Sequence, residues 1–323
     1  MTAGRPVGGD RRALTLALTG AVVTGSGSTL MHLAGSAPAT AAFFRSLFAL
    51  PFLAVLAARS RRCAPRRRVA LPLGAAVLAG ALLAADLLLW QKAVLTLGAG
   101  LSTVVQNTQV VYVAGAGWLF FGERVPARLL RFLPVLVAGV AVIAFGAPGV
   151  GDAPPAAGPS APVVGTVLAL VSALAYAGFL VVLRGRLSQP AVRARALLVV
   201  TGSTAAVSAA VGAATGGLNL TPGWTPAGWL AVLALTSQVL GWTVLMKAIS
   251  RLGSLRAALV LLVQPVAALV WAAVVLGEEP STWQTAGLAL VLVAVAAMTL
   301  PAAGQTGRPP MTLARSITRT EGQ

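Results

Sequence analysis

The chain has 323 residues, of which 57% are hydrophobic and only 10% are charged, and its formal net charge is +17. A soluble domain normally has about a quarter charged residues, and its surface could not accommodate so much apolar sequence. The composition therefore excludes an ordinary water-soluble domain and indicates that the lipid bilayer is the solvent. The basic residues stand in short clusters between apolar runs, which favours cytoplasmic loops over a nucleic-acid partner.

Ten apolar stretches are long enough to cross a bilayer as helices, which takes about 20 residues for a hydrocarbon core of roughly 30 Å. In chain order they are 13–33, 38–58, 69–91, 97–121, 127–147, 163–184, 194–215, 226–248, 254–276 and 282–300. Pro51 lies inside the second stretch and predicts a kink there. The sequence thus predicts an all-α integral membrane protein of ten transmembrane helices.

The stretch 13–33 also has a second interpretation. Arg11 and Arg12 precede it and small residues follow it, as in a cleavable signal peptide. Cleavage would leave nine spans, although a span of this length is long for the apolar core of a signal peptide.

The basic residues predict the orientation of the chain. The arginine-rich segment 59–68 follows the second span, whereas the next connection contains only Lys92. Apart from Lys92 and Arg45, which lies within a span, every Lys and Arg falls on the same side of the predicted membrane. Positively charged loops face the cytoplasm, so both termini are expected there, in a multi-pass protein of the plasma membrane.

Two parts of the sequence repeat one another. Residues 97–123 align without gaps to residues 252–278. The same offset pairs three polar residues with identical partners: Lys92 with Lys247, Gln109 with Gln264 and Glu123 with Glu278. Because each half has five spans, an odd number, the second copy must enter the membrane upside down. Such inverted repeats are typical of secondary transporters, whose substrate site lies near the midplane where the repeats meet.

The repeat divides the chain into five parts. The Pro-, Gly- and Ala-rich segment between the halves is expected to be an external linker, and the C-terminal segment lacks apolar periodicity and is expected to be disordered. The parts are a cytoplasmic N-terminus (1–12), a first five-helix repeat (13–147), the linker (148–162), a second five-helix repeat (163–300) and a cytoplasmic tail (301–323).

Several local motifs resemble the EamA domains of the drug/metabolite transporter superfamily. The motifs are Arg45, the Leu-Gly pairs that precede the fourth and ninth spans, Gln264–Pro265, and the Gly-Glu pairs 122–123 and 277–278. The resemblance covers residues 11–302. It implies a ten-helix carrier whose central cavity opens alternately to each side, and which moves amino acids, metabolites or drugs, often outward.

Two amides in the middle of repeat-related spans are candidate solute ligands. Gln109 and Gln264 are expected to face one another across the symmetry axis, and a neutral amide can both donate and accept hydrogen bonds from a polar or zwitterionic solute. Other candidates for the same cavity are Ser102, Gln106, Asn107, Tyr176, Gln238 and Trp242. The alternative is that these groups only bond neighbouring helices, as polar side chains commonly do in membranes. Pro265 frees a backbone carbonyl and is a candidate hinge or a passive kink.

Asp86 is the carboxylate, and Arg45 the guanidinium, that lie within the predicted spans away from their cytoplasmic ends. Both are expected near the outer ends of their spans, 69–91 and 38–58. Unpaired charges in a membrane cost several kcal/mol, so the two are expected to pair with each other or to reach water. Either Asp86 binds a proton or a substrate amine while Arg45 modulates it, or the two form a structural ion pair.

The sequence therefore predicts a secondary active transporter, an exporter of small metabolites, amino acids or drugs that works by alternating access. Its expected partners are a small-molecule solute, the bilayer and a coupling ion such as a proton. His32 is the single histidine and Cys63 the single cysteine, so no metal cluster or cofactor is expected, and no Gly-rich phosphate loop indicates ATP coupling. The alternative is a membrane-embedded enzyme, for which His32 and Asp86 offer little chemistry. The sequence leaves the oligomeric state open.

Overall fold

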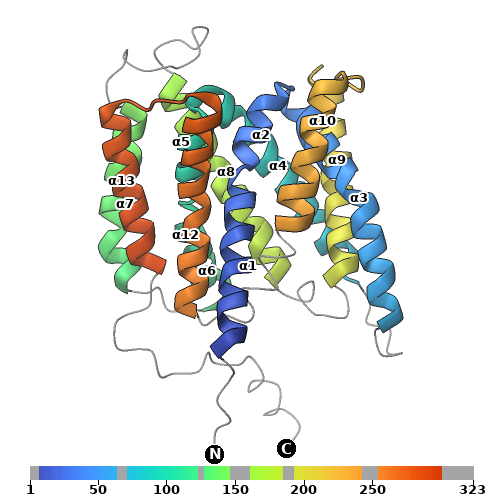
Figure 1. Cartoon of the computed structure of the whole chain (residues 1–323), viewed down its shortest axis with the longest axis horizontal. Coiled ribbons are helices and arrows are strands. Elements are labelled where there is room, and N and C mark those ends of the chain that lie inside the picture. The colour runs from blue at the N-terminus through green and yellow to red at the C-terminus, as the bar shows by residue number, and fades with distance from the viewer. Residues whose placement is uncertain are drawn as a thin grey trace, which may run out of the picture.

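The structure is a computed structural model that describes residues 7–63, 71–122, 127–145, 161–184, 193–241 and 254–299. These residues form a bundle of helices without strands (Figure 1). Most of the expected external linker, the whole expected cytoplasmic tail and Trp242 lie outside the described residues.

Helices occupy at least part of each of the ten apolar stretches. Six stretches contain one continuous helix: α3 (Pro38–Cys63), α4 (Leu73–Leu97), α7 (Ala127–Phe145), α8 (Ala161–Arg184), α9 (Arg193–Ala214) and α13 (Thr282–Thr299). The other four contain two consecutive helical segments: α1 (Val7–Gly25) and α2 (Gly27–Ala34), α5 (Ala99–Gln106) and α6 (Gln109–Phe121), α10 (Trp224–Leu233) and the π-helix η2 (Ala234–Gly241), and α12 (Ser254–Trp271) and the π-helix η3 (Ala272–Leu276).

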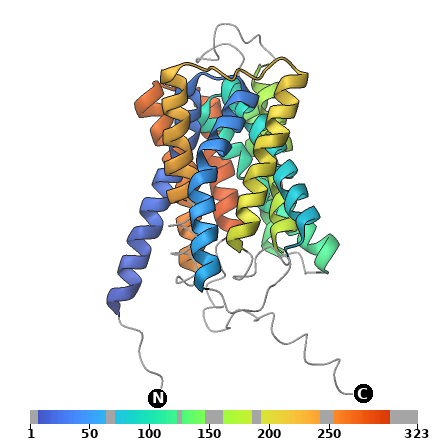
Figure 2. The same cartoon turned by 90° about the vertical axis from the view of Figure 1, so that its right-hand side faces the viewer.

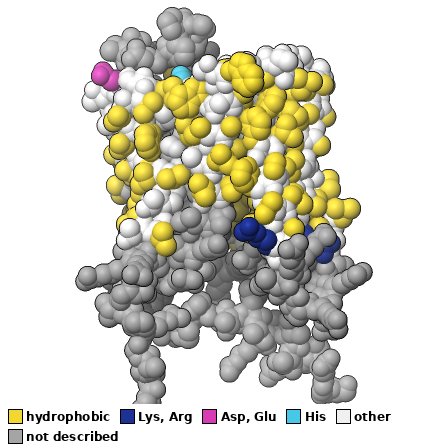
Figure 3. All heavy atoms as spheres, turned by 45° about the vertical axis from the view of Figure 1, so that its right-hand side comes forward, with side chains coloured by type: hydrophobic (Ala, Val, Ile, Leu, Met, Phe, Trp, Pro, Cys, Tyr) yellow, Lys and Arg dark blue, Asp and Glu magenta, His cyan; other side chains and the backbone are white. Residues whose placement is uncertain are grey.

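Length and apolar composition identify the helices that could cross a membrane unaided. Within the described residues these are Pro38–Arg59, Leu73–Leu97, Pro162–Leu183 and Ala194–Ala214, and shorter apolar segments cover Leu129–Ile143, Val263–Leu276 and Thr282–Ala297. Hydrophobic side chains are spread over the coloured part of the face shown in Figure 3, and Lys and Arg side chains lie at the lower edge of that part. Large apolar residues such as Trp118, Leu119 and Phe120 are more than half exposed, which suits contact with lipid rather than water. The chain is a multi-pass membrane protein.

The stretch 97–121, which the sequence predicts as one span, is interrupted between α5 and α6. The backbone N–H groups of Asn107 and Thr108 donate to carbonyls three residues back, Val104 O and Val105 O, at 3.0 Å each. The Asn107 side-chain amide donates to Thr103 O at 2.7 Å. The Asn107 side chain thereby competes with the regular helical bond to Thr103 O, and the helix tightens into a short turn and restarts at Gln109.

The two halves of the chain are packed against each other throughout the bundle. Repeat-related helices are in contact in three places: α3 packs on α9, α5 on α12 and α7 on α13. Figure 1 shows that α7 and α13 run in opposite directions. In the perpendicular view of Figure 2, α1 leans away from the bundle toward its N-terminal end. Between the halves, α4 also packs on α8 and α9, and α1 packs on α12.

The glycines of the two Gly-Glu pairs, Gly122 and Gly277, have the same backbone conformation in both halves. Gly122 ends α6 with φ 62° and ψ 21°, and Gly277 ends η3 with φ 67° and ψ 25°. Both glycines therefore adopt the left-handed conformation that commonly ends a helix. Residues other than glycine rarely adopt this conformation. A capping box opens the last span: Ser281 N donates to Gln284 Oε1 at 3.0 Å, and Gln284 N donates to Ser281 Oγ at 3.2 Å.

The α7–α13 contact depends on two glycines that face each other. A Cβ atom on Gly139 would lie 2.8 Å from Gly287 O, and one on Gly287 would lie 2.7 Å from Gly139 O. We expect Gly139→Ala to lower the free energy of unfolding by about 1–3 kcal/mol, the usual cost of overpacking a close contact. Gly115→Ala is the control, because a Cβ there meets nothing within 4 Å. Thermal unfolding of the purified variants measures the difference, and equal stabilities would contradict this view of the contact.

Candidate functional site

A cluster of polar side chains from three helices is buried inside the apolar bundle. Asp86 of α4 is only 3% exposed, and its Oδ1 accepts a hydrogen bond of 2.6 Å from Ser172 Oγ of α8. Gln106, the last residue of α5, donates from Nε2 to the same Oδ1 at 2.8 Å and to Ser172 Oγ at 3.0 Å. One carboxylate oxygen thus joins helices from both halves of the chain.

Two further side chains complete this cluster, which we call the Asp86 cluster. Arg45 of α3 is buried and interacts electrostatically with Asp86, and Tyr176 lies near both charged groups. Tyr176 lies one helical turn after Ser172 on α8, so the two share a face of that helix. The cluster therefore combines a carboxylate, a guanidinium, an amide and two hydroxyls from α3, α4, α5 and α8.

The Asp86 cluster lies deeper in the bundle than the sequence predicts. The expected third span ended at residue 91, which placed Asp86 near the outer surface, but α4 continues to Leu97. Asp86 is consequently close to the middle of α4, and Ser172 is close to the middle of α8. Residues 92–97 continue α4 despite the charged Lys92. The helix ends at Gly98, whose φ of 94° is incompatible with an α-helix.

The helix interruption between α5 and α6 lies directly beside the cluster. Gln106 is the residue before the turn, and the hydroxyl of Thr108, within the turn, is buried without a hydrogen-bond partner among the described residues. Interrupted helices at mid-membrane depth are where transporters commonly expose backbone and side-chain polar groups to a solute. The arrangement offers an anionic acceptor for an amine or a proton, a cation for an anionic group, and neutral donors beside both.

The other candidate residues occupy varied surroundings. Gln264 Nε2 donates to Thr24 Oγ1 of α1 at 3.0 Å, and Pro265 beside it is buried within α12. Gln109 is half-buried at the start of α6. Ser102 Oγ donates to Ala99 O of its own helix at 3.2 Å.

Two of the sequence candidates are described only in part or not at all. Gln238 belongs to η2, but its side chain is not among the described parts of the structure, and Trp242 lies outside them. Of the candidates, the structure brings Asp86, Arg45, Gln106 and Tyr176 together.

The sequence did not predict two important contacts. Ser172 is one small hydroxyl in a long apolar span, and no local pattern pairs it with Asp86. The sequence marks Glu278 only as part of a repeated Gly-Glu pair, yet its carboxylate bonds the start of α5, in the other half of the chain. The signal that could have identified Glu278 is its repetition with Glu123, each after a helix-ending glycine.

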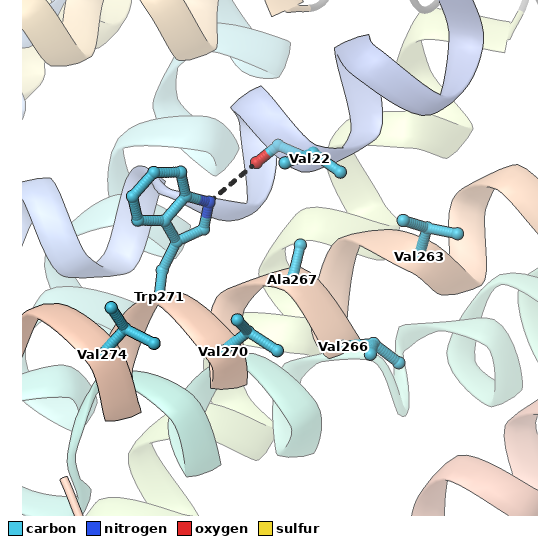
Figure 4. Close-up of a pocket in the computed structure, with 7 residues that line it drawn as sticks. All are labelled: Val22, Val263, Val266, Ala267, Val270, Trp271 and Val274. Atoms are coloured by element: carbon cyan, nitrogen blue, oxygen red, sulfur yellow. Dashed lines mark hydrogen bonds between the residues drawn. The ribbon is translucent and has the colours of Figure 1, made fainter. Parts of the chain in front are cut away.

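An apolar groove with a volume of about 460 Å³ lies between α1 and α12, and it differs sharply from the Asp86 cluster. Figure 4 shows its lining, in which Trp271 reaches across to α1 and donates from Nε1 to Val22 O at 3.3 Å. The seven lining residues are Val22, Val263, Val266, Ala267, Val270, Trp271 and Val274. These side chains offer hydrocarbon surface, which suits lipid chains and gives a polar solute nothing to bind.

Comparison with known proteins agrees with the arrangement of the helices. The chain matches the EamA-like transporter family twice, over residues 11–145 and 163–300. No curated protein matches the chain. One solved structure, titled "Crystal structure of protein", aligns with 90% of this chain and 96% of its own chain, at 19% sequence identity and a TM-score of 0.56. The similarity to this solved structure concerns the fold alone. Since the two family matches cover most of the sequence and confirm the resemblance of its motifs, the chain belongs to the EamA-like transporter family.

Proposed function

We propose that this protein is a secondary active transporter that exports small polar metabolites, amino acids or drugs across the plasma membrane by alternating access. The observation that carries the proposal is the buried Asp86 cluster, which lies where an interrupted helix of the first half meets α8 of the second half. A protein that only needed a stable bundle would gain little from burying a carboxylate and a guanidinium in its apolar interior. The outward direction follows from the family resemblance.

Ten membrane-spanning helices in two inverted repeats are part of the same proposal. Two observations support it: repeat-related helices pack on one another, and the repeated glycines Gly122 and Gly277 end their helices in the same conformation. In inverted-repeat carriers the solute binds where the repeats meet, and one half rocks against the other around it. The Asp86 cluster, built from α3, α4 and α5 of one half and α8 of the other, has this position.

The chemistry of the cluster favours a solute with an amino group. Asp86 supplies the anion for a cationic amine, and Arg45 supplies a cation for a carboxylate or another anionic group on the same molecule. Tyr176 adds a hydroxyl and an aromatic face, and the ring of Phe179 lies 5.6 Å from its ring. Amino acids and amine-bearing drugs present these groups together. A proton on Asp86 in the absence of solute would couple export to proton entry.

A stability screen on the purified protein identifies the solute class. A molecule that binds only the folded state raises the melting temperature, by mass action. We expect amino acids or amines to produce this shift, and simple sugars, which have neither group, to leave the melting temperature unchanged. Stabilisation by sugars alone would redirect the proposal to another solute class.

The inverted topology is tested independently of any solute. Cys63 is the single cysteine and the last residue of α3, at the arginine-rich end of that helix. We expect a membrane-impermeant thiol reagent to label Cys63 only from the side on which a tag at the C-terminus is accessible. Labelling of Cys63 and the tag from opposite sides would contradict the inverted repeat.

A further inference from the structure

The carboxylate of Glu278 bonds the first turn of α5, far from it in the sequence. Glu278 Oε1 accepts a hydrogen bond of 2.6 Å from Ala99 N, and Oε2 accepts one of 3.0 Å from Gly100 N. Glu278 follows η3 in the second half of the chain, whereas α5 belongs to the first half. The bidentate contact of Glu278 therefore joins the two halves at the end of the bundle where α5 begins (Figure 1).

The start of α5 is shaped to receive this carboxylate. The first N–H groups of a helix lack partners within the helix, and the helix dipole favours negative charge there. A Cβ on Gly98, whose φ is 94°, would lie 3.1 Å from Glu278 Oε2. A Cβ on Gly100 would lie 2.8 Å from Leu269 Cδ2 and 3.5 Å from Glu278 Oε2. Both glycines thus let Glu278 approach the backbone closely.

The other end of α5 belongs to the Asp86 cluster. The helix has eight residues, starts with the two N–H groups that Glu278 binds, and ends with Gln106, which bonds Asp86 and Ser172. Backbone hydrogen bonds link each turn of an α-helix to the next, so a shift at the first turn of α5 would be transmitted to Gln106. The interruption at Asn107 and Thr108 separates this movement from α6.

We propose that Glu278 is a latch that holds α5 against the second half of the protein, closing the outer end of the bundle and positioning Gln106 against Asp86. The proposal rests on the transporter function and orientation proposed above. Release of Glu278 from Ala99 and Gly100 frees α5 to move away from α12 and η3, which opens a path from outside. The same movement withdraws Gln106 from Asp86, so opening and loss of the solute site occur together.

The test measures access to a buried position on α5 from each side of the membrane. Val104 is fully buried and lies one turn beyond Gly100, on the helix face that meets Leu269. We place a single cysteine there, Val104→Cys, in a Cys63→Ser background. A membrane-impermeant thiol reagent is added to either face of oriented vesicles, and the labelling rate is compared with and without Glu278→Gln.

We expect Glu278→Gln to raise the labelling rate from the outer face by roughly tenfold, because charge-assisted hydrogen bonds contribute about that factor or more to an equilibrium. Labelling from the cytoplasmic face should not rise. Glu279→Gln is the matched control: it removes the same charge from the adjacent, exposed residue and should leave both rates unchanged. If Glu278→Gln does not fold, Glu278→Asp replaces it, since the shorter side chain cannot span both N–H groups equally well, and the same increase is expected.

Two outcomes would overturn the latch. One is an unchanged outer labelling rate. The other is an equal rise from both faces together with a lower melting temperature, which indicates general loosening rather than an opened gate. The labelling experiment needs no solute, so its failure is distinct from failure of the transport proposal, which solute flux decides.

Discussion

Replacing Asp86 by Asn is expected to abolish stabilisation by solute and to lower the transport rate by roughly 10- to 100-fold. The substitution keeps the size of the side chain but removes the charge that accepts bonds from Ser172 and Gln106 and that faces Arg45. Hydrogen bonds to charged groups contribute about 1.5–3 kcal/mol each, and about 1.4 kcal/mol corresponds to a factor of ten. Thermal shift and flux into proteoliposomes measure the two effects.

The control for this substitution is again Glu279→Gln, which removes a carboxylate at an exposed position. It should transport at the wild-type rate. Ser172→Ala removes one of the two donors to Asp86 and should reduce transport less than Asp86→Asn does. If Asp86→Asn transported at the wild-type rate, the carboxylate would have no part in solute binding or coupling.

The stability of the Arg45 variants separates a structural ion pair from a solute site. Removing one member of a buried pair leaves an uncompensated charge, so Arg45→Gln alone is expected to destabilise the fold by about 3–5 kcal/mol. In the double variant Arg45→Gln/Asp86→Asn neither charge remains. We expect the double variant to be more stable than the sum of the single effects implies, with a coupling of about 0.5–3 kcal/mol.

Transport and stability should respond differently in this double-mutant cycle. The double variant should lose less stability than the two single effects together imply, but it has neither ion with which to bind a zwitterionic solute and should remain inactive. Recovery of transport together with stability would assign Asp86 and Arg45 a purely structural role. Strict additivity of the two single effects would show that the side chains do not interact.

The sequence predicted much of the helical organisation because the physical signal for a membrane span is strong. Apolar stretches long enough to span a bilayer located the helical segments, and Arg45 and Asp86 were identified because charges in such stretches are costly. The capping box at Ser281 was also predictable, since it depends on a spacing of three residues.

The parts that the sequence did not predict depend on tertiary contacts or on subtle local competition. The interruption after Gln106 arises from the short-range bonding of Asn107 and Thr108, which hydropathy does not register. The partnership of Ser172 with Asp86 and that of Glu278 with Ala99 join residues far apart in the chain. Neither partnership leaves a periodic or spaced pattern. The one feature of the sequence that indicates a specific role for Glu278 is its repetition with Glu123.

Flux of the stabilising solute into proteoliposomes tests the central claim most directly. Vesicles preloaded with unlabelled solute should take up the labelled solute through the wild-type protein with saturable kinetics, and the Asp86→Asn protein should take up little more than protein-free vesicles. The account is contradicted if the wild-type protein binds the solute, as judged by its melting temperature, yet exchanges none of it across the membrane.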